Sequence, residues 1–342
     1  MTAEQDNLGR ETVETETVAS DGIDVSFVVI GFNEALHLRA CLESVRNADL
    51  EGLRYELIYV DGGSSDDSMA IARECGVDLI LGGERRRRAA ENRNLGASRS
   101  RGTYIQFLDG DMQLEPTWPK RAKAYLEGRP VVAVVCGRLL EVNRGYLFQV
   151  IQLDWVQREG AVETCGGAAL FRREPFQQAG AFPEDVAYGE EPLLCWRIRN
   201  QLKMEVHFWI EPMALHDIGF SGFRDYWKQY RRNGATYIEI AARCAGTEDP
   251  YWTRDTVTNF AWASGILAVI AFLLAGNATV RIGIALLILL IGLRKIIQTR
   301  RRGVSWAIAL GYTAHVYGSK IPLAWGQLRW LVERAFRGAK TQ

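Results

Sequence analysis

Five residues with amide or carboxylate oxygens stand where apolar stretches of the chain end. Asn33 and Glu34 follow the first stretch, Asp61 ends the second, and Asp109 and Asp111 end a later one. Open α/β sheets bind ligands at the carboxyl ends of their strands, so we expect these side chains to share one sheet edge. The last two carboxylates flank a single glycine and can turn toward one ion, and oxygen ligands suit Mg²⁺ or Mn²⁺. The pattern predicts a divalent-cation site.

The elements that must position these residues alternate along the first third of the chain. Apolar runs typical of strands cover Val25–Ile30, Glu56–Val60, Asp78–Leu81 and Tyr104–Leu108. Stretches typical of helices cover Glu34–Arg46, Asp66–Glu74 and Ala89–Ser98. This βαβ series predicts an α/β fold with a mostly parallel sheet and helices on its faces. No G-x-G-x-x-G follows the first strand and no G-x-x-x-x-G-K-S/T occurs, so a dinucleotide fold and a P-loop are not supported.

Composition limits the partners of the chain. The 342 residues include 41 basic and 41 acidic side chains, and this balance argues against a nucleic-acid partner held by bulk charge. The six cysteines are scattered without a C-x-x-C pair, which favours buried reduced thiols over disulfides or a zinc site. A catalytic part that faces the reducing cytosol follows from this. Residues 1–23 are acidic and nearly devoid of large apolar side chains, and are predicted to be a disordered tail.

The last quarter of the chain has the pattern of a membrane anchor. Thr256–Val280 has no charged residue and is long enough to cross a bilayer core of ~30 Å at ~1.5 Å per residue. Ile282–Leu293, extended to about Ile297, would complete a hairpin. Gly303–Ser319 is either a third span or a helix lying in the interface. The alternative is a buried helical hairpin of a soluble domain.

Basic residues set the expected orientation of this anchor. Arg294, Lys295 and Arg300 belong to a basic loop after the hairpin, and the C-terminal tail is basic as well. The positive-inside rule places both on the cytoplasmic face of the inner membrane, which two spans satisfy. We expect an interfacial amphipathic region at 223–255 and a membrane region of two or three helices at 256–342.

From Ser26 to Gly234 the chain resembles inverting glycosyltransferase family 2, whose nucleotide-binding domain has the GT-A fold. The matching segments, in order, are FVVIGFNEALHLRACLESV, YVDGGSSDDS, ENRNLGASRSRGTYIQFLDGDM, GGAALFRREPF, AGAFPEDVAYGEEPLLCWRIR and QYRRNG. The resemblance implies a GT-A domain over 24–222 that uses a nucleotide-diphosphate sugar. It also implies metal dependence through Mg²⁺ or Mn²⁺.

The resemblance assigns donor-site roles to individual residues. Asn33, Glu34 and Asp61 would surround the base and ribose, Asp109 the ribose, and Asp111 the metal on the diphosphate. Asn92 matches a residue near the nucleotide.

Three basic residues are further candidates for the same site. Arg88, the last of four consecutive arginines, is a candidate diphosphate contact, although such runs are usually solvated. Arg232 matches the Q-x-x-R element and would neutralise the leaving diphosphate, but its aromatic-basic surroundings equally fit a helix on anionic lipid. His216 stands where related enzymes carry a metal or phosphate contact, and a structural histidine is its alternative.

Catalysis requires a base for the acceptor hydroxyl, and Gly189-Glu190-Glu191 supplies the candidates. The family usually has Glu-Asp there with the second residue as base, so Glu191 takes that role and Glu190 an orienting one. Because Glu is longer than Asp by one methylene, Glu190 is the alternative base. Both acids would also fit the first turn of a helix without any catalytic role.

Together these features predict an inverting, membrane-associated glycosyltransferase that acts on a lipid-linked saccharide or similar membrane-proximal acceptor in surface-glycan synthesis. Two alternatives remain open. One is a polyprenyl-phosphate sugar transferase, whose acceptor is already anionic and needs no base. The other is a catalytically inactive scaffold that binds a nucleotide sugar at the membrane.

Overall fold

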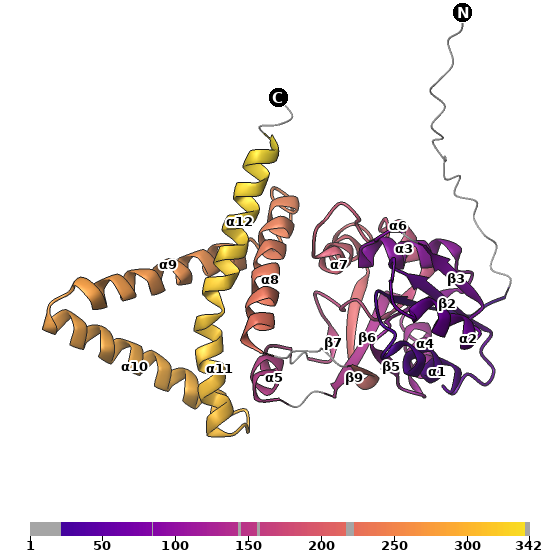
Figure 1. Ribbon diagram of the computed structural model, residues 1–342, viewed down its shortest axis with the longest axis horizontal. Coiled ribbons are helices and arrows are strands. Elements are labelled where there is room, and N and C mark those ends of the chain that lie inside the picture. Colours follow the sequence, from indigo (N-terminus) through magenta and orange to yellow (C-terminus); the bar gives the residue numbers. More distant parts are fainter. Residues whose placement is uncertain (1–21, 84, 143–144, 156–157, 217–221, 339–342) are drawn as a thin grey trace, which may run out of the picture.

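The computed structural model describes residues 22–83, 85–142, 145–155, 158–216 and 222–338. Figure 1 shows a sheet-centred domain on one side and a group of long helices on the other. The acidic tail predicted for residues 1–23 lies outside the described residues except for its last two positions.

The N-terminal half of the sheet is parallel, as the βαβ pattern predicts. Strand β1 (Val25–Gly31) lies between β2 (Tyr55–Asp61) and β4 (Tyr104–Asp109), and β3 (Leu79–Gly82) pairs with the outer side of β2. All three pairings are parallel, so the carboxyl ends of these strands face the same edge.

The remaining strands extend the sheet on the far side of β4. The order is β3-β2-β1-β4-β8-β6-β9-β5, with β7 paired to β9. The bounds are β5 Met112–Leu114, β6 Val132–Glu141, β7 Gly160–Ala161, β8 Leu170–Arg172 and β9 Glu205–His216. Strand β8 is antiparallel to both neighbours, whereas β6 and β9 run parallel. The sheet is therefore mixed, with its parallel part at the N-terminal end.

Helices cover both faces of the sheet. Their bounds are α1 Leu38–Arg46, α2 Ser68–Glu74, α3 Ala89–Arg99, α4 Trp118–Glu127, α6 Arg173–Gln178 and α7 Glu190–Asn200. One apolar core joins α1 and α4 to alternate residues of β1, such as Phe27. The other core joins α3, α6 and α7 to the opposite residues of the same strand, such as Val28. Period-2 alternation along a doubly covered strand produces this division.

Helix α1 begins later than its sequence pattern predicts. The expected helix from Glu34 starts only at Leu38, and Leu36 before it is 85% exposed. The reason is tertiary: the backbone N–H of Glu34 donates to Ser68 Oγ, and that of Ala35 donates to Asp66 Oδ2. These contacts with the segment between β2 and the start of α2 hold residues 35–37 in a turn.

Five helices form the C-terminal part. They are α8 Phe223–Arg243, α9 Thr253–Ala275, α10 Ala278–Arg300, α11 Trp306–Gly318 and α12 Lys320–Gly338. Helices α8 and α12 pack along each other, and α9 and α10 form a hairpin that projects away from the rest of the molecule (Figure 1). A Cβ at Gly234 of α8 would meet the Leu323 carbonyl, and one at Gly326 of α12 would meet the Arg231 carbonyl. Glycine at both positions therefore permits backbone-to-backbone approach of the two helices.

Within the described ranges, α9 is the one helix whose length and composition would let it cross a membrane. Its 23 residues have a mean hydropathy of 2.0 in the most apolar window, and only 11% of that window is buried. Helix α10 is equally long and also exposes apolar side chains such as Leu286 and Leu290. Helix α11 has 13 residues and would reach only about 20 Å at ~1.5 Å per residue, short of a bilayer core of ~30 Å.

A polar cluster joins the C-terminal helices to the sheet domain. Short helix α5 (Tyr146–Ile151) and a 3₁₀ turn, η1 (Gln152–Asp154), approach α11. The Asp154 carboxylate contacts His315 Nε2 at 2.7 Å and accepts from the Tyr312 hydroxyl at 2.7 Å. The histidine side of this contact is buried, with His315 6% exposed, whereas the Asp154 side chain is 38% exposed.

Candidate active site

Asp61 organises the loop at the carboxyl end of β2. Its side chain is 1% exposed and accepts from the backbone N–H of Gly63 at 2.9 Å and of Ser64 at 2.8 Å. Its other oxygen accepts from the Tyr59 hydroxyl at 3.1 Å. All these donors come from the strand end and its own loop, so Asp61 shapes the glycine-serine turn that faces the site.

Asn33 and Glu34 lie across from that turn. Asn33 adopts a positive φ of 57°, and its Oδ1 accepts from the backbone N–H of Ser65 at 2.8 Å. The Glu34 pKa is raised to about 7, first by burial and then by the negative charges of Asp111 and Asp109. The loops after β1, β2 and β4 are thus drawn together, as the strand pattern predicts.

Asp111, Glu141 and His216 form a half-buried group of two carboxylates and one imidazole beside this edge. His216 Nδ1 contacts Glu141 Oε1 at 2.6 Å, and His216 Nε2 lies 3.7 Å from Asp111 Oδ2. Burial lowers the His216 pKa, but the hydrogen bond and charge of Glu141 outweigh it, and the net pKa is raised. Burial and the neighbouring Asp109 raise the Asp111 pKa. The group thus brings two carboxylates and one imidazole close together.

The same group has the free ligand atoms that a cation needs. Asp111 Oδ1 and Glu141 Oε2 are buried and have no hydrogen-bond partner. A buried oxygen without a partner is costly, and a hard divalent cation would satisfy it. The donor set of carboxylate oxygens and one imidazole nitrogen fits Mg²⁺ or Mn²⁺. Asp111 and His216 are therefore close enough for the metal roles expected of them, and Glu141 joins them.

Arg93 links two parts of the site. One is the donor edge, the sheet edge at the carboxyl ends of β1, β2 and β4 where the sugar donor is expected to bind. The other is the pair of acids at the start of α7. Its Nη2 donates to Asp109 Oδ1 at 2.6 Å and its Nη1 to Glu190 Oε1 at 3.3 Å. The Arg93 side chain is 5% exposed, and a Cβ at Gly167 would collide with its guanidinium. Glu190 is 23% exposed, and it shares the Arg93 guanidinium with Asp109. The structure thus brings the predicted ribose-binding carboxylate and one of the two candidate bases together.

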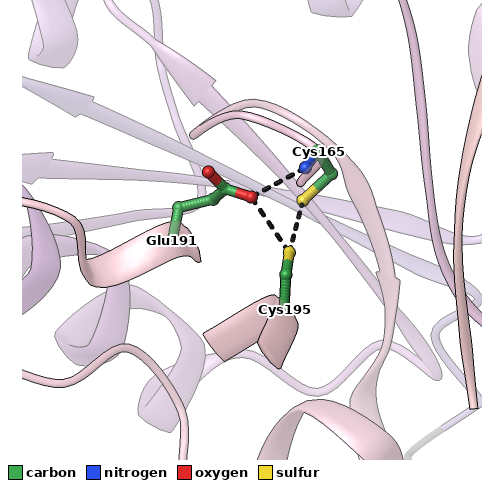
Figure 2. A group of neighbouring side chains, drawn as sticks. All are labelled: Cys165, Glu191 and Cys195. Atoms are coloured by element: carbon green, nitrogen blue, oxygen red, sulfur yellow. Dashed lines mark hydrogen bonds between the residues drawn. The ribbon is translucent and has the colours of Figure 1, made fainter. Parts of the chain in front are cut away.

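The carboxylate of Glu191, the next residue, contacts a different part of the molecule from that of Glu190. Its Oε1 accepts from the Cys165 backbone N–H at 2.7 Å and from the Cys195 thiol at 2.9 Å, as Figure 2 shows. The side chain is 9% exposed. Burial raises the Glu191 pKa, and the hydrogen bonds from Cys195 and Cys165 only partly oppose this shift. Glu190 and Glu191 therefore occupy different environments.

The remaining predicted donor-site residues are placed as follows. Asn92 is 3% exposed beside Gly62, and its Oδ1 is buried without a partner, which leaves an acceptor available for a ligand. Arg88 precedes α3 and donates from Nη1 to the Val186 carbonyl at 3.1 Å, toward the loop before α7. Arg232 lies over the ring of Tyr188 at 5.5 Å. Each of these two arginines is thus near the α7 end of the site.

A cavity of about 970 Å³ opens beside the metal-binding group. Strands β6 and β9 and helix α5 line it, and it reaches the backbone of Gly166 and Gly167 under Arg93. Its wall includes His216 and Glu141 at one side. Apolar lining residues are Met112, Leu139, Leu140, Phe148, Trp155, Phe208, Ile210 and Met213. The lining of the cavity is therefore partly polar and partly apolar, and the cavity lies next to the donor edge.

Three features of the site were not predicted from the sequence: the Arg93 bridge, the Glu141 partner of His216, and the two thiols around Glu191. Arg93 belongs to a segment that the family resemblance includes, so that segment carried a signal for it. Glu141 and Cys165 carried none, because their partners are distant in sequence: Glu141 and His216 are 75 positions apart, and Cys165 and Glu191 are 26 apart.

Comparison with known proteins identifies the sheet domain. Residues 26–180 match the family described as "Glycosyl transferase family 2". The chain is 30% identical over 112 residues to Glycosyltransferase AglE of Haloferax volcanii, an alignment covering 31% of this chain and 36% of the relative. It is 28% identical to the Pre-mycofactocin glycosyltransferase of Mycobacterium tuberculosis over 57% of this chain and 43% of the relative. The chain thus spans less than half the length of these two relatives.

A solved structure shares the fold over most of the chain. The mannosyltransferase PcManGT from Pyrobaculum calidifontis, solved in complex with GDP-Man and Mn²⁺, superposes with a TM-score of 0.62 at 17% identity. The superposition covers 89% of this chain and 86% of that one. The mixed sheet, parallel from β3 through β2 and β1 to β4, is the GT-A fold expected from the sequence.

Proposed function

Because residues 26–180 form a glycosyltransferase family 2 domain, we propose that this protein transfers a sugar from a nucleotide-diphosphate donor to a membrane-proximal acceptor. The observation that carries the proposal is the Arg93 bridge, which joins donor-edge Asp109 to Glu190 at the start of α7. Sugar transfer requires that a residue binding the donor and the base for the acceptor hydroxyl are held in fixed positions relative to each other, and Arg93 would hold Asp109 and Glu190 in this way.

The donor would bind along the carboxyl ends of β1, β2 and β4. Asn33, Glu34 and Asp61 would contact the base and ribose, and Asn92 has a free buried acceptor for the same nucleotide. Asp111 and His216, with Asp109 close by, would hold Mg²⁺ or Mn²⁺. When bound, the ion would neutralise the charge of the donor diphosphate.

Two arginines would act on the diphosphate side of the donor. Arg88 and Arg232 both lie beside the loop that leads into α7, through contacts with Val186 and Tyr188. A guanidinium there would stabilise negative charge as the diphosphate leaves. This assignment continues the roles expected from the sequence.

The base would accept the proton of the acceptor hydroxyl while that oxygen attacks the anomeric carbon. The bond to the diphosphate breaks from the opposite face, and the configuration inverts. Geometry favours Glu190, because it faces Arg93 and Asp109, whereas one oxygen of Glu191 is held by two interior donors. Glu191, the base expected from the sequence, would have to turn out of that environment first.

A lipid-linked saccharide or other amphiphile would suit the acceptor side. What supports this is the apolar lining of the 970 Å³ cavity beside His216, and the contact of the adjoining helix α5 with α11. The exposed hairpin of α9 and α10 would anchor the chain, with the sheet domain at the cytoplasmic face of the inner membrane. Surface-glycan synthesis is the process that such a placement would serve.

The test is a donor screen on membranes that contain the full chain. Nucleoside-diphosphate release would be followed for a panel of nucleotide sugars with lipid extract and Mn²⁺ or Mg²⁺. Glu190→Gln, Glu191→Gln and Asp111→Asn would be compared with the exposed control Asp67→Asn. Loss with Asp111→Asn and with Glu190→Gln, but not with the control, supports the proposal.

Other outcomes identify the alternatives. If Glu191→Gln abolishes release and Glu190→Gln does not, Glu191 is the base. If neither glutamate is needed, the acceptor is already anionic, as in a polyprenyl-phosphate sugar transferase. Donor binding without release from any nucleotide sugar would indicate an inactive scaffold.

A further inference from the structure

The fold assembles a compact group of two thiols and one carboxylate behind the candidate active site. Cys165 precedes β8, and Glu191 and Cys195 lie one turn apart on α7. The two sulfurs are 3.5 Å apart, and the Cys195 sulfur is 2.9 Å from Glu191 Oε1 (Figure 2). One potential ligand atom from each residue lies within 4.8 Å of the other two. All three residues are buried.

We propose that Cys165, Glu191 and Cys195 form a binding site for a thiophilic divalent metal ion, with Zn²⁺ as the natural candidate. The proposal goes beyond the sugar-transfer function and concerns an ion distinct from the one at Asp111. The scattered cysteines gave no sign of such a site, because Cys165 and Cys195 are 30 positions apart in sequence.

The spacing fits tetrahedral coordination with small movements. With Zn–S near 2.3 Å and Zn–O near 2.0–2.2 Å, two sulfurs would stand roughly 3.8 Å apart, and a sulfur and an oxygen roughly 3.5 Å. The observed 3.5 Å between the sulfurs and 2.9 Å between sulfur and oxygen would have to expand by about 0.3 Å and about 0.6 Å. Three protein ligands would leave a fourth position for water or a backbone oxygen.

The chemistry of the ligands selects the ion. Two sulfurs favour zinc over Mg²⁺ or Ca²⁺, which prefer all-oxygen sites. Burial raises the Cys195 pKa to about 11, so the metal-free site holds thiols. Binding one Zn²⁺ would release the two thiol protons and leave two thiolates and the carboxylate as ligands. Cys165 lines the 970 Å³ cavity, which provides the path for the ion and these protons.

The location gives the ion a structural consequence. Cys165 adjoins Gly166 and Gly167, and Gly167 lies against the guanidinium of Arg93. Glu191 adjoins Glu190, the other partner of Arg93. The ion would tie the Cys165 loop to the first turn of α7 and so fix both supports of the Arg93 bridge.

Metal analysis of the full chain tests the site. Detergent-solubilised protein, purified without chelators or a polyhistidine tag, would be incubated with Zn²⁺, desalted and analysed by mass spectrometry for metal. We expect about one zinc per chain, and less than about a tenth of that in Cys165→Ser and Cys195→Ser. Cys244→Ser, a buried thiol outside the group, is the matched control and should retain the ion.

A second measurement guards against misfolded variants. Cd²⁺ added to the wild-type chain should produce thiolate-to-metal charge-transfer absorption with a one-to-one end point, and Zn²⁺ should reverse it. Thermal unfolding of each variant would confirm that it is folded. Wild-type protein that retains neither metal, variants that bind zinc as well as the wild type, or a Cys165–Cys195 disulfide in the chain as isolated would each overturn the proposal. None of these readouts depends on sugar transfer, so the failure of one proposal leaves the other intact.

Discussion

Arg93 Nη2 lies 2.6 Å from Asp109 Oδ1, and this ion pair connects helix α3 to the end of strand β4. Because the guanidinium is planar, its second nitrogen is directed at the same time toward Glu190. The donor edge and the start of α7 are therefore positioned by a single side chain.

Arg93→Lys should lower kcat/KM by about 10- to 100-fold, because lysine keeps the charge but cannot hold both carboxylates in one fixed geometry. Arg99→Lys, on the exposed side of the same helix, should leave activity unchanged. Steady-state kinetics with the donor identified in the screen would measure both. Equal activity in the two variants would contradict a positioning role for Arg93.

Gly167→Ala should produce a similar loss, because its Cβ would displace the Arg93 guanidinium. Gly128→Ala is the control, since its φ of −72° and ordinary contacts accept a methyl group. The double variant with Arg93→Lys should be scarcely worse than either single variant, because both act on the same contact. Additive losses would show that Gly167 acts by another route.

Glu141→Gln should raise the Mg²⁺ or Mn²⁺ concentration needed for half-maximal activity by about 10- to 100-fold. Glu141 holds His216 by a 2.6 Å contact and has one buried oxygen without a partner. Activity at saturating metal should remain close to that of the wild type. A loss that no metal concentration restores would instead place Glu141 in the chemical step.

The contact between Asp154 and His315 should make docking of the C-terminal helices sensitive to acid. Burial alone would raise the Asp154 pKa, but hydrogen bonds from His315 and Tyr312 and the charge of Lys320 lower it below its ordinary value. A lowered folded-state pKa stabilises the fold above the unfolded pKa of about 4, and this contribution is lost as pH falls through the folded pKa.

Asp154→Asn should therefore lower the Tm of the full chain at pH 7, and the difference from wild type should shrink below about pH 4. Tryptophan fluorescence during heating in detergent would measure it. Asp67→Asn, exposed on the other side of the molecule and without a side-chain cap bond, should show no such difference. A difference that grows toward low pH would contradict the sign of the effect.

Charged substitutions on α9 should weaken membrane association. Leu267 and Phe272 are 61% and 59% exposed on the helix. An aspartate at each position would add a large cost to burial in lipid. Flotation of the double variant with liposomes should recover less protein than the wild type. Val131→Asp, on a similarly exposed residue of the sheet domain, should float normally.

The sequence predicted the parallel half of the fold because its strands are continuous apolar runs separated by helical patterns. Strands such as β5 and β8 have three residues each, too few to give a pattern of their own, and they pair with distant segments. Helix α1 starts later than its pattern predicts because Asp66, and Ser68 at the start of α2, bind the backbone N–H groups that would have begun the helix. Such long-range hydrogen bonds override local propensity.

The site, like the fold, has a part that could be predicted from the sequence and a part that could not. Carboxylates at strand ends were predictable because topology alone brings them together. The different environments of Glu190 and Glu191 were not, because they depend on Arg93 and Cys165, each from a separate element. Neighbours in sequence at a helix start point about 100° apart, so two adjacent acids can enter different environments.

At Gly234 and Gly326 the backbones of α8 and α12 approach each other without an intervening side chain. Tyr226 of α8 is joined through His315 to the turn that borders the cavity. If α9 lies in the bilayer as we propose, the catalytic edge is held at a constant height above the lipid surface. Acceptors would then be selected by the reach of their head group as well as by its chemistry.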